Sequence, residues 1–260
     1  MKSNATRTQI FGLFVLAGQP LTGGQVVALA RPLGLSATNV RSHLTRLVAE
    51  GALLREGPRR SALYRPGAER AQLVSGLAAR LEEAPAAPWD GRWIVVAPRL
   101  PADRPGRRAR LDRLWFDGFR PHSPACHIRP TWPAPWARER ALAHAAVPGS
   151  LAFCGESLLP LDMAAVRRMY AVDTLDRHAH ALADRLRRRI RTLRSGASAL
   201  ATRLELGGQV ARLVAHDPRL PREILGDLAG LRELVAAYGQ FEREAAARSR
   251  EFLEEILRGA

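Results

Sequence analysis

The amino-acid sequence predicts an α+β protein of several domains. Three helical patterns and a pair of strand-like segments fill residues 1–66, strand and helix patterns alternate over residues 89–160, and residues 161–260 are mainly helical in pattern. The length of 260 residues exceeds what one small domain needs. Hydrophobic residues make up 47% of the chain and charged residues 25%, so the chain can bury a substantial core.

The first two helices are indicated by apolar spacing and by capping residues. Residues 6–17 place apolar side chains at the i, i+3, i+4 and i+7 spacing of one helical face, and Gly18 and Pro20 end this pattern. Thr22 is a suitable N-cap for a second helix. Gly34 then provides a tight turn, because glycine readily adopts the left-handed backbone conformation that ends helices.

A third helix is predicted to begin after Ser36, which can cap it, and to end at Gly51. Val40, Leu44 and Leu47 are spaced to form its inward face. The opposite face of this helix is therefore expected to be exposed to solvent.

A β-hairpin is predicted after the third helix. Residues 52–56 and 61–65 are strand-like, and the turn at residues 57–60 contains a glycine, a proline and two arginines. Three helices followed by a hairpin with a basic tip predict a winged helix-turn-helix, a DNA-binding fold, at residues 1–66.

A proline-rich segment separates this part from the rest of the chain. Residues 67–88 begin with a helical pattern and end in a linker whose composition stiffens the chain and packs no core. A strand at residues 93–97, an amphipathic helix at residues 107–116 and an extended segment at residues 127–130 then predict a small α/β domain at residues 89–160.

The last part of the chain, residues 161–260, is predicted to be a helical domain. Glycine and proline break its helical pattern at four places, Ser195-Gly196, Gly207-Gly208, Asp217 to Pro221, and Gly226.

The charge of the chain points to an anionic partner. The formal net charge is +15, and residues 1–65 alone carry nine basic residues against two acidic ones. Such a field attracts polyanions and raises their encounter rate. The basic excess is greatest in the part of the sequence that predicts a DNA-binding fold, so double-stranded DNA is the expected partner.

Several classes of protein are disfavoured by the sequence. The only two cysteines, Cys126 and Cys154, exclude a disulfide scaffold and a four-thiolate metal site. No apolar run approaches the ~20 residues that cross a bilayer, and the N-terminus lacks a cleavage site of the secretory type. We therefore expect a cytoplasmic protein with no membrane partner and no cofactor.

Three separated motifs resemble the PaaX-like repressor family, which is named for the control of phenylacetate catabolism in bacteria. They are GLSATNVRSHLTRLVAEGALLREGPRRSALYR, then WDGRWIVV with RARLDRLWFDGFRPHSPACHIRP, and finally HDPRLPREIL. The resemblance implies a ferredoxin-like middle domain and a homodimer on a palindromic DNA operator. It also implies a repressor that an aryl- or acyl-coenzyme A thioester, or another aromatic effector, releases from DNA.

The third helix and the hairpin tip carry the candidate DNA-binding residues. At the tip, Arg59 and Arg60 are expected to enter a minor groove or to contact phosphates. On the helix, the side chains that face away from the core are suited to base edges and phosphates: Thr38, Asn39, Arg41, Ser42, Thr45 and Arg46. The alternatives are an ordinary solvated helix face and a charged tip that only prevents edge-to-edge aggregation.

Candidate effector-binding residues lie in the two later domains. Trp93 and Trp115 offer apolar surface for an aryl group, while Arg129 and Arg188 offer positive charge for phosphates. The alternative for the tryptophans is core packing. Arg188 belongs to a run of arginines at residues 185–194, which an ordinary solvated helix face also explains.

The sequence gives little support for catalysis. His178 and His180 lie about 200° apart on a helix, unlike two ligands that share one metal ion. A nuclease on the ferredoxin-like fold would use an aspartate at the end of its first strand, but residues 93–100 contain none and Asp103 comes later. Two alternatives to a specific regulator stay open, a metal-dependent nuclease on the middle domain and an architectural protein that binds all duplexes through charge.

Overall fold

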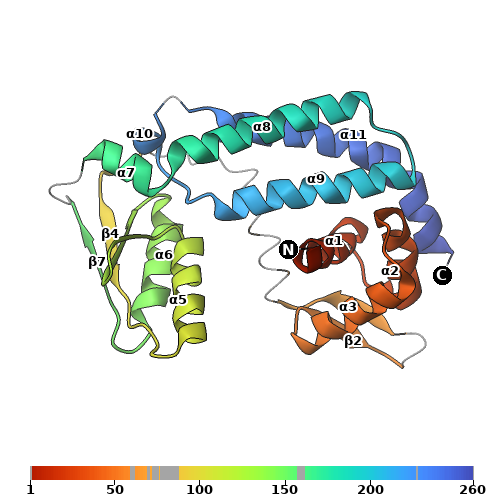
Figure 1. The fold of residues 1–260 in the computed structure, drawn as a ribbon, viewed down its shortest axis with the longest axis horizontal. Coiled ribbons are helices and arrows are strands. Elements are labelled where there is room, and N and C mark those ends of the chain that lie inside the picture. The colour runs from red at the N-terminus through yellow and green to blue at the C-terminus, as the bar shows by residue number, and fades with distance from the viewer. Residues whose placement is uncertain are drawn as a thin grey trace. The chain divides into compact units, whose positions relative to one another are not determined.

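The computed structural model describes residues 2–58, 62–68, 71, 76, 88–156, 162–226 and 228–259 (Figure 1). In the first part of the chain these residues form α1 (Lys2–Ala17), β1 (Leu21–Thr22), α2 (Gly23–Ala30), the short 3₁₀ helix η1 (Arg31–Leu33), α3 (Ala37–Ala49), β2 (Leu53–Glu56) and β3 (Leu63–Pro66). They continue with β4 (Trp93–Ala97), α5 (Arg104–Phe116), β5 (Arg120–Ser123), β6 (Cys126–Pro130), α6 (Ala134–Ala145), β7 (Leu151–Gly155), α7 (Met163–Met169), α8 (Val172–Arg191), α9 (Ala197–His216), α10 (Arg222–Leu225) and α11 (Gly230–Arg258). The predicted α+β class is confirmed.

The chain divides into two compact units. Unit 1 comprises residues 1–82, 181–212 and 233–260, and unit 2 comprises residues 83–180 and 213–232. Stretches of the C-terminal helices thus belong to each unit. The four domains that the sequence predicts, with boundaries after residues 66, 88 and 160, stay a prediction.

The N-terminal helices begin and end where capping residues were predicted. The Thr22 hydroxyl accepts a hydrogen bond from the Gln25 backbone N–H at 3.1 Å, and the Gln25 side chain accepts one from the Thr22 N–H at 2.8 Å. Gly34 ends η1 with a φ of 73°, a left-handed conformation that strains residues with a Cβ atom. The turn between α2 and α3 therefore depends on this glycine.

Unit 1 contains a small antiparallel sheet of order β1-β3-β2. Strands β2 and β3 pair with Leu53 opposite Pro66 and Glu56 opposite Leu63, as a hairpin requires. The sequence did not indicate β1, which adds only Leu21 and Thr22 to the edge of β3.

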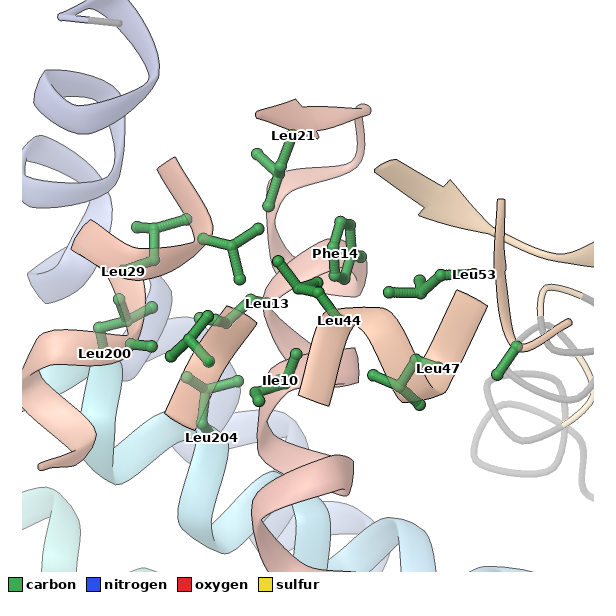
Figure 2. Close-up of a cluster of buried hydrophobic side chains, with 14 residues drawn as sticks. Ile10, Leu13, Phe14, Leu21, Leu29, Leu44, Leu47, Leu53, Leu200 and Leu204 are labelled. Carbon is green, nitrogen blue, oxygen red and sulfur yellow. The ribbon is translucent and has the colours of Figure 1, made fainter. Parts of the chain in front are cut away.

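The core of unit 1 joins segments that are far apart in the sequence. Ile10, Leu13 and Phe14 of α1 are at most 2% exposed, and they share one apolar cluster with buried residues of α2, α3 and β2. Leu200 and Leu204 of α9 belong to the same cluster, and Figure 2 shows their side chains beside α1. Apolar side chains of α11 pack against its periphery. The N-terminal elements therefore bury apolar surface against the C-terminal part of the chain.

Unit 2 is built on an antiparallel sheet of order β5-β6-β4-β7. In chain order its elements run strand, helix, strand, strand, helix, strand, so two strand-helix-strand segments interleave. Helices α5 and α6 contribute Leu114, Ala137 and Ala141 to the core on one face of this sheet. Val166 of α7 and Ile224 of α10 pack with the core on the other face.

Three of the four predicted helix breaks in the C-terminal part are present. Helix α8 ends before Ser195-Gly196, α9 ends at His216, and α10 ends before Gly226. The predicted break at Gly207-Gly208 is wrong, because α9 runs through both glycines. Packing explains this result: Leu206 and Val210 are buried, and their burial outweighs the roughly 1 kcal/mol by which a glycine disfavours a helix.

Among the described residues, the structure contains no helix that is long and apolar enough to cross a membrane. Cys126 and Cys154 are both free thiols.

Candidate nucleic-acid interface

Helix α3 has one buried face and one exposed face. Val40, Leu44 and Leu47 are at most 3% exposed, as their spacing predicted. The six predicted DNA-binding residues of this helix are all exposed: Thr38, Asn39, Arg41, Ser42, Thr45 and Arg46. Because residues at i, i+3, i+4 and i+7 share one side of a helix, these six form one continuous surface, which we call the α3 face.

The first turn of α3 is held by a side-chain cap. The Ser36 hydroxyl accepts a hydrogen bond from the Asn39 backbone N–H at 3.2 Å. Further along, the Thr45 hydroxyl donates to the Arg41 carbonyl at 3.1 Å, which leaves the Thr45 methyl group for apolar contacts. The cap fixes the start of α3, and with it the direction in which the α3 face points.

The two arginines of the α3 face have no acidic partner among the described residues. Elsewhere in unit 1, Arg65 on β3 is paired with Glu56 on β2 at 2.6 Å. A guanidinium carries five N–H donors. Arg41 and Arg46 therefore present donors and positive charge to solvent, which suits them to phosphate oxygens or to guanine edges.

His43 lies on α3 but outside the α3 face. Its side chain is only 7% exposed, and no hydrogen-bond partner for its Nδ1 atom is present in the described part of the chain. Burial, followed by the positive charges of Arg46 and Arg7, lowers the pKa of His43. The imidazole is therefore neutral near pH 7 and adds no charge to the helix.

The tip of the predicted hairpin cannot be compared with its prediction. Arg59 and Arg60 lie outside the residues that the structure describes. The strands on either side, β2 and β3, pair as predicted. Contact between these two arginines and DNA stays a prediction.

The four candidate effector residues differ in their surroundings. Trp93 is 4% exposed within the apolar core beside α7 and α10, whereas Trp115 on α5 is 39% exposed. Arg129 is completely buried, and Arg188 on α8 is exposed. Arg188 belongs to unit 1 and the other three residues to unit 2. Trp93 and Arg129 thus have the surroundings of core residues, while Trp115 and Arg188 contact solvent.

Arg129 is held by backbone carbonyl groups. Its Nε donates to the Pro130 carbonyl at 3.0 Å, and its two terminal nitrogens donate to the carbonyls of Asp117 and Trp132. The guanidinium also lies 4.5 Å from the centre of the Trp136 ring. A buried charge with these partners links α5, β6 and the segment before α6, and each of its three nitrogens already donates a hydrogen bond within the fold.

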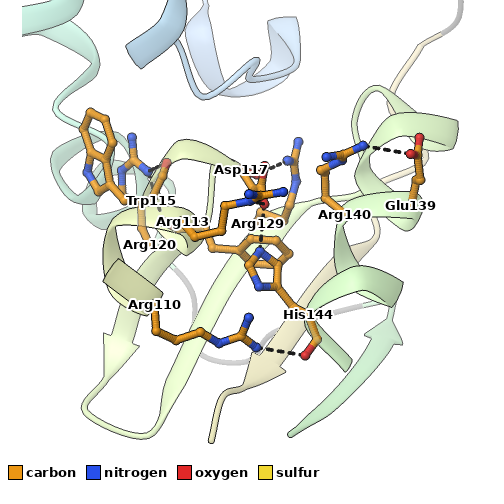
Figure 3. Close-up of polar contacts among 10 residues, drawn as sticks. Arg110, Arg113, Trp115, Asp117, Arg120, Arg129, Glu139, Arg140 and His144 are labelled. Atoms are coloured by element: carbon orange, nitrogen blue, oxygen red, sulfur yellow. Dashed lines mark hydrogen bonds and ion pairs between the residues drawn. The ribbon is translucent and has the colours of Figure 1, made fainter. Parts of the chain in front are cut away.

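A buried contact between a carboxylate and an imidazole in unit 2 was not predicted. His144 of α6 lies with its Nε2 atom 2.9 Å from a carboxylate oxygen of Asp117, and both side chains are at most 8% exposed (Figure 3). Arg113 approaches the same carboxylate at 3.4 Å. The two partners are 27 positions apart in the sequence and no spacing pattern relates them, so the sequence contained no signal for this contact.

Two residues considered for catalysis have contacts within helices: His180 lies with its Nδ1 atom 3.2 Å from a carboxylate oxygen of Asp176, and Asp103 lies at the start of α5. Asp103 caps α5, because its side chain accepts a hydrogen bond from the Gly106 N–H at 2.7 Å. Within the described ranges, no group of three or more His, Cys, Asp or Glu side chains is placed to hold a metal ion.

Comparison with known proteins supports the resemblance seen in the motifs. Residues 5–69 match the family model described as PaaX-like protein. This confirms the resemblance over the segment that contains α2, α3 and the β2–β3 hairpin. The PaaX-like match thus includes the whole α3 face.

A solved structure is similar in fold to most of the chain. The structure is similar to that of the uncharacterized protein Rv0674 from Mycobacterium tuberculosis, with a TM-score of 0.56 and 18% sequence identity. The similarity covers 90% of this chain and 91% of the other. At this identity the likeness concerns the fold alone. No curated protein matches the chain.

Proposed function

We propose that this protein is a sequence-specific DNA-binding transcriptional regulator, most simply a repressor of a catabolic operon. In this proposal residues 1–66 are a winged helix-turn-helix, α3 is its recognition helix, and the β2–β3 hairpin is its wing. The observation that carries the proposal is the α3 face, on which six exposed polar or basic residues stand on a helix whose other side is core. The PaaX-like match over residues 5–69 supports the same assignment.

The side chains of the α3 face suit base readout in a major groove. Arg41 can pair with the O6 and N7 atoms of guanine, Asn39 can pair with adenine, and the methyl group of Thr45 can pack on the methyl group of thymine. Arg46, with Arg59 and Arg60 of the wing, would contact phosphates and set the register of the protein on the duplex. The net charge of +15 favours association with the duplex but cannot by itself select a sequence.

The proposal includes a homodimer, a small-molecule effector and a cytoplasmic location. Unit 2, whose strand order supports a ferredoxin-like domain, is not needed for reading DNA and is free to sense a metabolite. The family resemblance points to an aryl- or acyl-coenzyme A thioester as the effector. Such a ligand releases DNA only if it binds the DNA-incompetent arrangement more tightly than the competent one.

Selection from a pool of random duplexes with the full-length protein tests the function. The proposal predicts an enriched palindrome with half-sites about 10 base pairs apart, centre to centre, or a multiple of that spacing. A pool with no enriched sequence would contradict specific readout and would favour a protein that binds all duplexes through charge. An enriched half-site without its symmetric partner would contradict the homodimer.

A further inference from the structure

Unit 2 contains a cavity of about 420 Å³ that lies beside α5 and the β5–β6 strands. Its apolar lining includes Leu100, Leu111, Trp115 and Phe119. Ligand pockets in proteins span roughly 300–1,000 Å³ and combine an apolar lining with a few polar groups. This cavity therefore has the size for a small organic molecule with one or two rings.

One polar group of the cavity is His127 on β6, whose side chain is 5% exposed. Burial, followed by the proximity of His144, lowers the pKa of His127, so its imidazole is neutral near pH 7. Its Nδ1 atom has no hydrogen-bond partner among the described residues. A buried polar atom without a partner costs roughly 1–3 kcal/mol, and none of the described protein groups fixes which ring nitrogen carries the proton. The ring is free to adopt the tautomer that a ligand in the cavity requires.

The second polar group is Arg107, an exposed residue in the first half of α5. In the described part of the chain no acid is paired with Arg107, whereas Arg108 is paired with Asp112 at 3.7 Å and Arg113 approaches Asp117. Asp112 also lines the cavity, and the ion pair with Arg108 offsets its charge. The rim of an apolar cavity thus carries an arginine that no acid in the described ranges neutralises.

We propose that this cavity binds a small apolar monocarboxylate, whose ring or branched body packs against Trp115 and Leu111 and whose carboxylate is held by Arg107 and the imidazole of His127. A guanidinium matches a carboxylate because both are planar and can form two parallel hydrogen bonds. An aromatic ring gains a further contribution from contact with an indole. The proposal differs from the effector site predicted from the sequence, because of those four residues only Trp115 lines the cavity.

The ligand class also differs from a coenzyme A thioester. Conversion to a thioester removes the carboxylate that Arg107 would hold, and the nucleotide part of coenzyme A has no counterpart in an apolar cavity of this size. Control of DNA binding by this ligand rests on the proposed function. Binding of the ligand to the cavity does not rest on that function, and it can be measured without DNA.

Calorimetric titration of the full-length protein with 2-naphthoate tests the site. The proposal predicts one saturable site per chain and affinity at least tenfold weaker for 2-naphthamide, which has the same ring system without the charge. The substitution Arg107→Gln is expected to weaken 2-naphthoate binding at least tenfold. The substitution Arg104→Gln, which removes the same charge from an exposed residue of α5 that does not line the cavity, is expected to change it less than twofold.

A spectroscopic measurement separates binding in the cavity from binding elsewhere. In nuclear magnetic resonance spectra, 2-naphthoate should shift the ring signals of His127 and leave those of the exposed His122 unchanged. Absence of saturation, equal affinity for acid and amide, equal losses in the two arginine variants, or unchanged ring signals of His127 would each overturn the proposal. A protein that binds 2-naphthoate but selects no DNA sequence would refute the proposed function and leave this site standing.

Discussion

The arginines of this protein differ in whether another group already uses their donors. Arg129 is buried and donates to three backbone carbonyls, so its role lies within the fold. Arg185 on α8 is paired with Glu205 at 2.9 Å. Arg41 is exposed without an acidic partner in the described part of the chain, and it shares its helix face with polar neighbours. At the scale of single residues, these surroundings make Arg41 the strongest candidate for contact with a base.

Substitution of Arg41 by alanine is predicted to cost about 1–3 kcal/mol of binding free energy on the selected operator, because one bidentate contact with a base is lost. Preference at one position in each half-site should relax. Fluorescence anisotropy with single-base variants of the operator measures both effects.

Arg108→Ala is the matched control, since it removes the same charge from an exposed helical position in unit 2. It should leave the base preference at every position unchanged. A loss of preference that is the same for Arg41→Ala and Arg108→Ala would refute the assignment of Arg41 to base readout.

The stability of the protein is predicted to fall as the pH falls below about 6.5, in part because of His127. Its pKa is lowered from the ordinary value of 6.5 by burial, so the unfolded chain binds a proton at a pH at which the folded protein does not. Proton binding then favours the unfolded state, and the loss continues until the pH reaches the lowered pKa of the folded protein.

Thermal unfolding of His127→Gln at about pH 7.5 and about pH 5.5 tests this account. The fall in melting temperature between the two pH values should be smaller than in the wild type, whatever the cost of the substitution itself. The exposed His122→Gln should keep the wild-type fall. A fall that is unchanged in His127→Gln would show that His127 contributes nothing to acid sensitivity.

At the scale of elements, local capping explains why some of them could be predicted. Thr22, Gly34 and Ser36 occupy the cap and turn positions that their side chains or backbone favour. Strand β4 was predicted because its four buried residues make a continuous apolar run. Strands β5 and β7 were not, because β5 is short and polar and β7 has exposed residues on an edge of the sheet.

Helix α6 was missed for a different reason. It begins with prolines at Pro133 and Pro135, which suggest an irregular segment in a sequence but are compatible with the first turn of a helix. The candidate functional residues also differ in how far the sequence could predict them. The α3 face was predictable from one helix period, whereas the Asp117–His144 pair depends on the fold of unit 2.

The capping residue of α3 provides a prediction at this scale. Ser36→Ala removes the hydrogen bond to the Asn39 N–H and should destabilise the first turn of α3 by about 1 kcal/mol. Hydrogen exchange at the Asn39 amide should become faster, and operator affinity should fall with it. Ser36→Gly is the control, since glycine at an N-cap costs only a few tenths of a kcal/mol. Equal exchange rates in the wild type and in Ser36→Ala would contradict a role for the cap.

At the scale of the molecule, the N-terminal elements do not complete their own core. Leu200 and Leu204 of α9 close the apolar cluster of α1, α2 and α3, and Gly12 lies so close to Leu204 that a Cβ atom there would meet its side chain at 2.8 Å. Side chains of α11 add to the same cluster. No local pattern predicted this arrangement, because about 190 residues separate α1 from α9.

Leu200→Ala is therefore predicted to destabilise the N-terminal elements by about 2–5 kcal/mol, the usual cost of removing a buried leucine side chain. Native-state hydrogen exchange of the α1 amides measures this change. Leu142→Ala, at a position that is 70% exposed, should change the stability by less than about 0.5 kcal/mol. Unchanged protection of α1 in Leu200→Ala would mean that the N-terminal elements fold without α9.

We propose above that the α3 face reads a DNA sequence. The most direct measurement is the ratio of the affinities of the full-length protein for its selected operator and for a scrambled duplex of the same length and composition, at one physiological salt concentration. We expect a ratio of about 10³ or more, because base contacts add to a charge contribution that both duplexes share. A ratio near one would contradict it, since binding would then come from the positive charge of the chain alone.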